Sequence, residues 1–187
     1  MRSYEMILVE QCAPTLMGVK PASLFRCQED GKTPAREIAA RWNREFSPFG
    51  ITVRTLKICP HTGACLVYLY RDGWLHQILE EAENRAFLIQ RGYQVEAGCD
   101  GLLEQLSERL CLEKEFPHEI GVFLGYPLED VVGFIKNRGQ NYTCCGCWKA
   151  YGDPQAAQRR FDQYRRCTAI CKDRLRQGAL ITQLIAA

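Results

Sequence analysis

Hydrophobic and polar positions alternate most regularly between residues 51 and 70 of this chain. Successive side chains of an extended strand point to opposite sides, and this segment contains two runs that follow such a period of two. The residues Pro-His-Thr-Gly at 60–63 separate the runs and are typical of a turn. We therefore predict an antiparallel β-hairpin at 51–70, and further short strands at 4–9, 24–27 and 148–151.

Elsewhere, apolar residues recur at steps of three and four, which predicts amphipathic helices. These stretches begin at residues suited to a helix start, because proline is tolerated in the first turn and aspartate or threonine can cap free backbone N–H groups. Glycine often follows, as it does where a helix ends in a left-handed residue. The helix from Asp72 is expected to continue to Gly92. The expected helices start at Pro34, Asp72, Asp100, Pro117, Pro127 and Pro154.

Strands and helices are interleaved in this pattern, but the clearest pairing is an antiparallel hairpin. The predicted fold class is therefore α+β, or loosely α/β, with a small mixed or antiparallel sheet packed by five to six helices. A length of 187 residues suits one domain, and we predict a single domain over residues 1–187.

Eleven cysteines are many for a chain of this size, and the odd number leaves at least one thiol without a partner in the chain. The first twenty residues lack a long apolar run behind a basic start, so we expect no signal peptide. No apolar run approaches the roughly 18 residues that a membrane helix needs. We therefore expect a cytoplasmic protein with reduced thiols, in which cysteines indicate core packing, metal binding or redox chemistry.

The formal net charge is only +2, but acidic groups are concentrated in the middle of the chain and basic groups at its end. A nucleic-acid-binding domain is more often basic overall, with a pI above about 9, so this balance speaks against a nucleic-acid partner. We expect no membrane partner either, and the oligomeric state is left open. The basic stripe on the helix from Pro154 is interpreted mainly as a solvated face that pairs with the acidic middle segment.

Three motifs stand out along the chain. They are CAPTLMGVK at 12–20, FPHEIGVFLGYP with the following DV and GFI at 116–135, and GCWKAY at 146–151 followed by the helix with F-x-x-Y-x-x-CT at 161–168. Together these motifs resemble an uncharacterised family, domain-of-unknown-function family 3793, found mostly in anaerobic Firmicutes. The likeness covers nearly the whole chain, yet it implies no reaction, cofactor or catalytic residue. This sequence differs from the family pattern by placing Cys144 and Cys147 around Cys145.

Cys12 is the first candidate for chemistry, because it follows an expected strand and precedes a proline turn. A thiol at a strand end near cations can have a lowered pKa and act as a nucleophile. His118 could serve as its base and Glu119 could orient that base. The alternative interpretation is a buried cysteine and a pair of polar residues at a helix start, and buried free cysteine is common.

The same motifs contain four candidate ligand-binding residues, Lys20, Tyr126, Trp148 and Lys149. Cys145 and Cys167 are candidate metal ligands, because tetrahedral zinc or an iron–sulfur cluster needs thiolates that converge from separate segments. The chain does not contain two C-x-x-C motifs that could combine into the usual zinc signature, so scattered core and surface thiols are the alternative interpretation. No particular cofactor follows from the sequence.

The sequence is compatible with three functions. The first is the binding or handling of a small molecule, metal or redox group at a thiol-containing pocket between the Cys12 loop and segment 116–130. The second is an enzyme with Cys12 as nucleophile and His118 as base. The third is a non-catalytic interaction module that uses the basic C-terminal helix and the apolar tail at 179–187.

Overall fold

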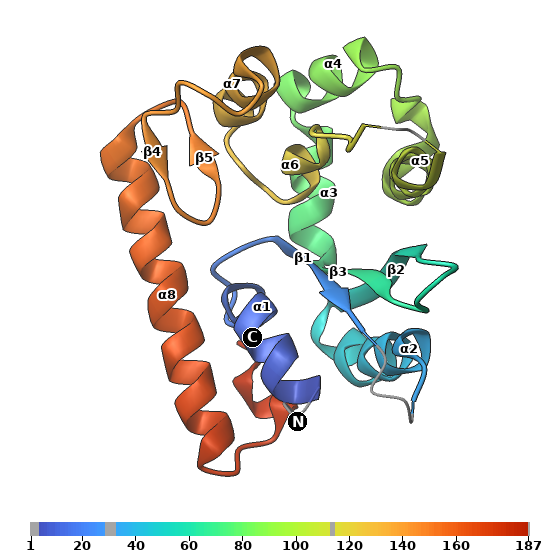
Figure 1. Cartoon of the computed structure of the whole chain (residues 1–187), viewed down its shortest axis with the longest axis vertical. Helices are drawn as coiled ribbons and strands as arrows, with labels where there is room; N and C mark the ends of the chain where they lie inside the picture. The colour runs from blue at the N-terminus through green and yellow to red at the C-terminus, as the bar shows by residue number, and fades with distance from the viewer. Residues whose placement is uncertain (1–3, 29–32, 113–114, 187) are drawn as a thin grey trace. The chain divides into compact units, whose positions relative to one another are not determined.

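The structure of the protein is a computed structural model that describes residues 4–28, 33–112 and 115–186. The chain divides into two compact units, each of which is described separately (Figure 1). Unit 1 comprises Met1–Leu75 and Cys167–Ala187, and unit 2 comprises His76–Arg166. The expectation of a single domain stays a prediction.

Unit 1 is built on a three-stranded antiparallel sheet with the strand order β1-β3-β2. The central strand β3 pairs with both neighbours, and the register to β2 shifts between Thr55 and Lys57. The strands are β1 (Ala22–Cys27), β2 (Ile51–Ile58) and β3 (Cys65–Arg71), and the helical elements are α1 (Tyr4–Leu16), α2 (Ala35–Phe46), the 3-10 turns η1 (Ser47–Phe49) and η3 (Ile181–Leu184), and parts of α3 and α8.

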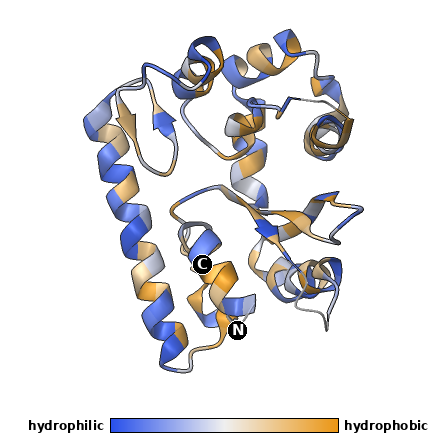
Figure 2. Ribbon diagram, in the orientation of Figure 1, coloured by the Kyte–Doolittle hydropathy of each residue, from blue (hydrophilic) through white to orange (hydrophobic). Residues whose placement is uncertain are grey.

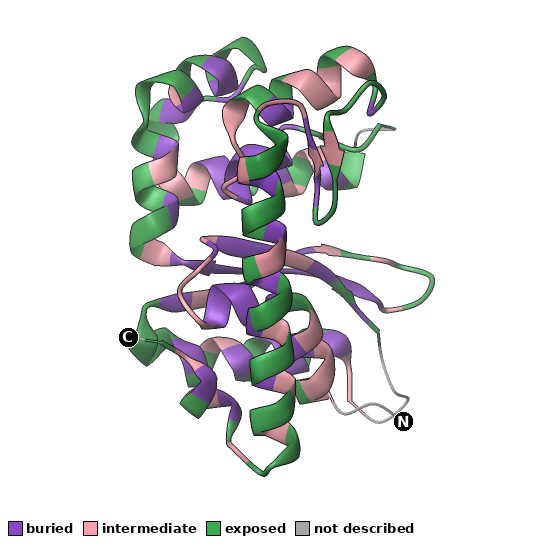
Figure 3. Cartoon of the chain, turned by 90° about the vertical axis from the view of Figure 1, so that its left-hand side faces the viewer, coloured by how far each residue is buried: buried purple, intermediate pink, exposed green. Residues whose placement is uncertain are grey.

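The predicted hairpin at 51–70 is confirmed by the antiparallel pairing of β2 and β3, which bury one face of the sheet in the core. That face packs against α1 and α2 around the buried side chains of Phe25, Trp42, Val67 and Leu69. Most residues of β1 and β3 are buried, whereas β2 is partly exposed (Figure 3). The core of unit 1 therefore lies between one face of the sheet and these two helices.

The strand expected at 4–9 was wrong, since residues 4–16 form the helix α1. Leu8, Val9, Cys12, Ala13 and Leu16 are fully buried, at steps of one, three and four that suit a helix packed on a core. Figure 2 shows the apolar character of this segment. A short run of Ile, Leu and Val fits a buried strand as well as a buried helix, so its length does not distinguish the two.

The buried guanidinium of Arg71 holds the end of α1. It donates hydrogen bonds to the backbone carbonyls of Thr15 and Leu16, at 2.8 Å each, and to that of Ala186 at 2.8 Å. The last carbonyls of a helix lack partners within the helix, and a cation there also complements the helix dipole. Arg71 thus fixes both α1 and the C-terminal segment, whose side chains Ile181 and Leu184 are buried in the same core.

Unit 2 is mainly helical and carries a small two-stranded antiparallel sheet. Its strands pair Cys144 with Ala150 and Cys145 with Lys149. Its elements are the end of α3 (Asp72–Glu80), α4 (Ala82–Gln90), the 3-10 turn η2 (Val95–Ala97), α5 (Gly98–Leu112), α6 (Ile120–Phe123), α7 (Leu128–Asn137), β4 (Cys144–Cys145), β5 (Lys149–Ala150) and α8 (Pro154–Arg176) up to Arg166.

The single helix expected from Asp72 to Gly92 is divided at Glu81, whose backbone is extended. The buried amide of Asn84 donates to the carbonyl of Ile78 and to the carboxylate of Glu81, at 2.9 Å each, and so stabilises the break. The described residues therefore contain eight α-helices, more than the five to six expected.

The α+β class is confirmed, and the sheet of unit 1 is antiparallel. Within the described ranges, none of the helices combines the length and the apolar character needed to cross a bilayer.

Candidate functional site

The thiol of Cys12 is fully buried on α1 rather than placed in a loop. Burial raises its pKa well above the usual range, and the opposing effects of the Lys20 ammonium and a hydrogen bond with Ser23 are smaller. The Ser23 hydroxyl also lies 2.9 Å from that of Thr15. A thiol held neutral in a packed interior is a weak nucleophile at neutral pH.

His118 and Glu119 have different surroundings in unit 2. The His118 ring is exposed and lies against Phe134, with ring centres 4.8 Å apart. The Glu119 carboxylate is buried and accepts hydrogen bonds from the Tyr93 hydroxyl at 3.1 Å and from Arg109 at 3.3 Å. Glu119 is thus committed to an internal ion pair and hydrogen-bond network.

Cys12 belongs to unit 1, whereas His118 and Glu119 belong to unit 2. The proposed pairing of thiol and imidazole therefore stays a prediction. The same holds for a pocket between the Cys12 segment and residues 116–130.

The four candidate ligand-binding residues have distinct environments. Lys20 is buried in unit 1. The Lys149 ammonium donates to the carbonyl of Gly139 at 2.7 Å and lies 5.1 Å from the centre of the Tyr142 ring. Tyr126 stacks on Trp148 with ring centres 4.9 Å apart, and burial raises the pKa of its hydroxyl. Of these four residues, Trp148 lines the pocket described below.

The candidate metal ligands are also in different units, with Cys145 exposed on β4 and Cys167 buried on α8. In the part of the chain that the structure describes, no three His, Cys, Asp or Glu side chains gather as metal ligands. Metal binding at Cys145 and Cys167 stays a prediction.

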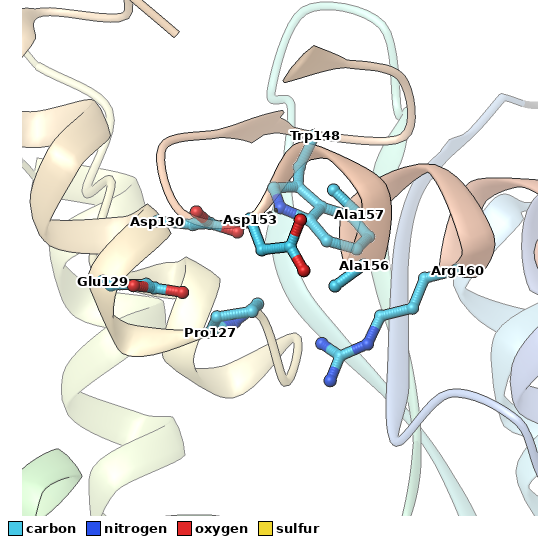
Figure 4. Close-up of a pocket in the computed structure, with 8 residues that line it drawn as sticks. All are labelled: Pro127, Glu129, Asp130, Trp148, Asp153, Ala156, Ala157 and Arg160. Atoms are coloured by element: carbon cyan, nitrogen blue, oxygen red, sulfur yellow. Dashed lines mark hydrogen bonds between the residues drawn. The ribbon is translucent and has the colours of Figure 1, made fainter. Parts of the chain in front are cut away.

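A pocket of about 170 Å³ lies within unit 2, where α7 and α8 both begin. Its walls combine apolar side chains with carboxylates and one guanidinium, and Figure 4 shows Glu129 and Arg160 on opposite sides in that view, with the Asp153 carboxylate between them. The lining residues are Pro127, Glu129, Asp130, Trp148, Asp153, Ala156, Ala157 and Arg160.

The buried carboxylate of Asp130 builds the back of this pocket. One oxygen accepts the indole N–H of Trp148 at 2.7 Å, and the other accepts the backbone N–H groups of Tyr151 at 2.6 Å and Gly152 at 3.0 Å. The Trp148 ring also meets Phe161 edge to face, with centres 4.5 Å apart. Asp130 is therefore a positioning residue that joins the first turn of α7 to the chain after β5.

The other charged side chains of the pocket belong to Asp153, Glu129 and Arg160, and each has its own environment. Asp153 caps α8, because its carboxylate accepts the backbone N–H of Gln155 at 2.8 Å. The Glu129 carboxylate packs against Gly152, where a Cβ atom would meet it at 2.1 Å. Among the described residues, neither Glu129 nor Arg160 has an ion-pair partner within 4.0 Å. One anionic and one cationic group thus remain available to a ligand.

The sequence had singled out Trp148 as a site residue, but not Pro127, Glu129, Asp130, Asp153 or Arg160. Acidic residues are common in first helical turns, so these carboxylates read as ordinary helix-start groups. The signal that could have found the pocket is the pair of proline-started helices on either side of Trp148, each with acids at its start.

Among the described residues, the ion pairs of α8 join it to residues of the same helix, to Asp153 just before it and to α1, so the expected pairing with the acidic middle segment stays a prediction. Two of these pairs join residues three apart, which lie on one face of the helix. The pairs join Arg159 to Asp153, Arg165 to Asp162, Arg176 to Asp173, and Lys172 to Glu10 on α1.

The chain matches one described protein family, "Protein of unknown function (DUF3793)", over residues 8–185. No curated protein and no solved structure matches the chain.

Proposed function

Since the chain belongs to this family of unknown function, we propose a role from the geometry of unit 2: the pocket between α7 and α8 binds a small zwitterionic molecule with one ammonium and one carboxylate group. The observation that carries the proposal is the open pair of opposite charges, Glu129 and Arg160, on the two sides of the Trp148 wall (Figure 4).

The volume of the pocket limits the ligand. At roughly 30 Å³ per water molecule in the liquid, 170 Å³ corresponds to about five or six waters. Pockets for drug-sized molecules usually have volumes of about 300 Å³ or more. The proposed ligand is therefore of the size of a small amino acid.

The chemistry of the walls assigns each part of such a ligand a place. Arg160 would bind the carboxylate, because a guanidinium offers two parallel N–H donors. Glu129 and Asp153 would bind the ammonium group. The short aliphatic body would lie on the Trp148 ring and between Pro127 and the two alanines, where burial of apolar surface is favourable.

Asp130 supports this role without needing to touch the ligand. Its three hydrogen bonds hold the Trp148 ring and the segment after β5 in one position. Preorganised walls reduce the entropy that binding would otherwise cost.

The other candidate functions have weaker support from the structure. A nucleophilic role for Cys12 would have to overcome the raised pKa of a buried thiol. A docking role for the C-terminal segment would have to release Ile181 and Leu184 from the core of unit 1. We keep a cytoplasmic location as part of the proposal, supported by the composition rather than by the fold.

The test is a calorimetric titration of the full chain with glycine, 3-aminopropionate and 4-aminobutyrate. These probes carry the same two charges at increasing separation. Butylamine and butyrate, each with one of the charges, are the matched controls. We expect at least one zwitterion to bind at least tenfold more tightly than either single-charge control.

Two variants then assign the ends of the ligand. Arg160→Gln should remove most of the zwitterion affinity, whereas Arg166→Gln at another exposed position of α8 should not. Glu129→Gln should weaken zwitterion binding, whereas Glu83→Gln on α4 should leave the affinity unchanged. Equal affinity for zwitterion, butylamine and butyrate, or equal effects of the site and control variants, would refute the proposal.

A further inference from the structure

Two cysteines of unit 1 face each other across neighbouring strands. Cys27 is the last residue of β1, Cys65 is the first residue of β3, and the antiparallel register pairs them directly. Both side chains are almost completely buried and belong to the core face that packs on α1 and α2. They are therefore neighbours in space although 38 positions separate them in the sequence.

The hydrogen-bond pattern fixes the spacing of this pair. The N–H of Arg71 donates to the carbonyl of Pro21 at 2.9 Å, and hydrogen-bonded pairs recur at every second position of an antiparallel ladder. Because the register between β1 and β3 is regular, Cys27 and Cys65 also form a hydrogen-bonded pair. Such pairs have Cα atoms about 5.5 Å apart, within the roughly 4.4–6.8 Å that a disulfide spans.

The Cβ atoms of a hydrogen-bonded pair lie about 5.5 Å apart, about 1 Å more than a disulfide allows. A small approach of the two strand ends is therefore required, and both cysteines stand at strand ends. A bond that must draw its strands together is more easily reduced than a relaxed structural disulfide.

We propose that Cys27 and Cys65 form a reversible intramolecular disulfide when the protein meets a small-molecule disulfide or a peroxide. With a disulfide oxidant, one cysteine thiolate displaces a small thiol, and the other cysteine then displaces the second small thiol. The two cysteines lose two electrons and two protons in total, and the oxidant leaves as two thiols. With hydrogen peroxide, the products are the protein disulfide and two water molecules.

The surroundings of Cys27 set the rate of this reaction. Burial, followed by the effect of neighbouring Cys65, raises the pKa of Cys27 to about 11. The thiolate population near neutral pH is then small, so oxidation should be slow and should accelerate about tenfold per pH unit.

Cys59 provides an internal comparison at the same end of the sheet. Hydrogen bonds from the Thr62 hydroxyl and from the backbone N–H groups of His61 and Thr62 lower the pKa of its thiol. Its backbone N–H donates to the carbonyl of Ala64, which places Cys59 opposite Ala64 rather than Cys65. Cys59 should react with oxidants earlier, but as a single thiol.

The experiment oxidises the full chain with oxidised glutathione or hydrogen peroxide, alkylates the remaining thiols and digests it with trypsin without reduction. Cleavage after Arg26 and Lys57 gives peptides 27–32 and 58–71. We expect these peptides to be linked, with a mass two hydrogens below their sum, and to separate on reduction. The Cys59→Ala variant should retain the link because peptide 58–71 still contains Cys65.

The Cys27→Ala and Cys65→Ala variants should lose the link while keeping the far-UV circular dichroism of the parent. Peptide 167–172 serves as a further control, because Cys167 and Cys171 lie four apart within α8, where the regular helix holds their Cβ atoms about 5–6 Å apart and cannot close the gap as two strand ends can. A link that disappears in Cys59→Ala would overturn the proposal. So would free, alkylated Cys27 and Cys65 in protein whose Cys59 is fully oxidised.

Discussion

Asp130→Ala would remove the carboxylate that connects α7 to the chain around β5. Three donors, the Trp148 indole and the backbone N–H groups of Tyr151 and Gly152, would then lose a buried acceptor. Each unsatisfied buried group costs about 1–3 kcal/mol, so with three such groups the free energy of unfolding should fall by at least about 3 kcal/mol. That is a large part of the 5–15 kcal/mol typical of whole proteins.

Asp130→Asn keeps the shape and one acceptor oxygen, but its amide N–H₂ group would face one of the three donors. We expect this variant to lose about 2 kcal/mol, less than the alanine variant. Asp162→Asn on the exposed side of α8 is the matched control and should change stability by less than about 0.5 kcal/mol.

The measurement is urea unfolding followed by circular dichroism, with a second readout from ligand binding at the pocket. Asp130→Asn should also weaken zwitterion binding, because the Trp148 wall loses its fixed position. An alanine variant within 1 kcal/mol of the parent would refute the reasoning that these three hydrogen bonds hold unit 2 together at this point.

Three further predictions concern other parts of the fold. Arg71→Met should lower the free energy of unfolding by about 3 kcal/mol, because three backbone carbonyls lose a charged donor. Burial raises the pKa of Cys27 and Cys171 from 9.0 to about 11, so the folded state favours the neutral thiols. The contribution of these two thiols to the free energy of unfolding should be constant below pH 9 and fall by about 1 kcal/mol per pH unit per thiol between pH 9 and 11. Urea unfolding under reducing conditions measures this loss. Gly133→Ala should cost about 1–3 kcal/mol, because its Cβ would lie 2.4 Å from the Tyr151 ring.

Each of these predictions has its own control. Arg176→Met, at an exposed position of α8, should change stability by less than about 0.5 kcal/mol. The double variant Cys27→Ala/Cys171→Ala should flatten the loss between pH 9 and 11, and an unchanged slope would contradict the assignment. Gly73→Ala, which meets no atom within 4 Å on α3, should be neutral or stabilising.

Local sequence patterns predicted the elements that have one apolar face and bury it in the core. The hairpin at 51–70 and the helix α2 were recognisable because period two and period 3.6 each leave a distinct apolar stripe. The helix α1 was missed because its core residues lie among other apolar residues, so the run resembled a strand. The break at Glu81 was missed because the amide of Asn84, rather than a glycine or proline, stabilises it.

The candidate site was harder to predict than the fold. Trp148 was chosen from its motif, but the role of Asp130 depends on three donors that are 18 to 22 positions away in the sequence. The pairing of Cys27 with Cys65 depends on strand register, which no spacing of cysteines reveals. Contacts of this kind arise from tertiary structure and leave no local pattern.

The most direct test of the proposed function follows the indole N–H signal of Trp148 by ¹H–¹⁵N NMR during a titration with 4-aminobutyrate, assigned through a Trp148→Phe variant. Binding in this pocket should give a saturable shift of this signal in the parent protein and little or no shift in Arg160→Gln. A signal that stays in place at saturating probe, or that moves equally in both proteins, would contradict the assignment of the pocket.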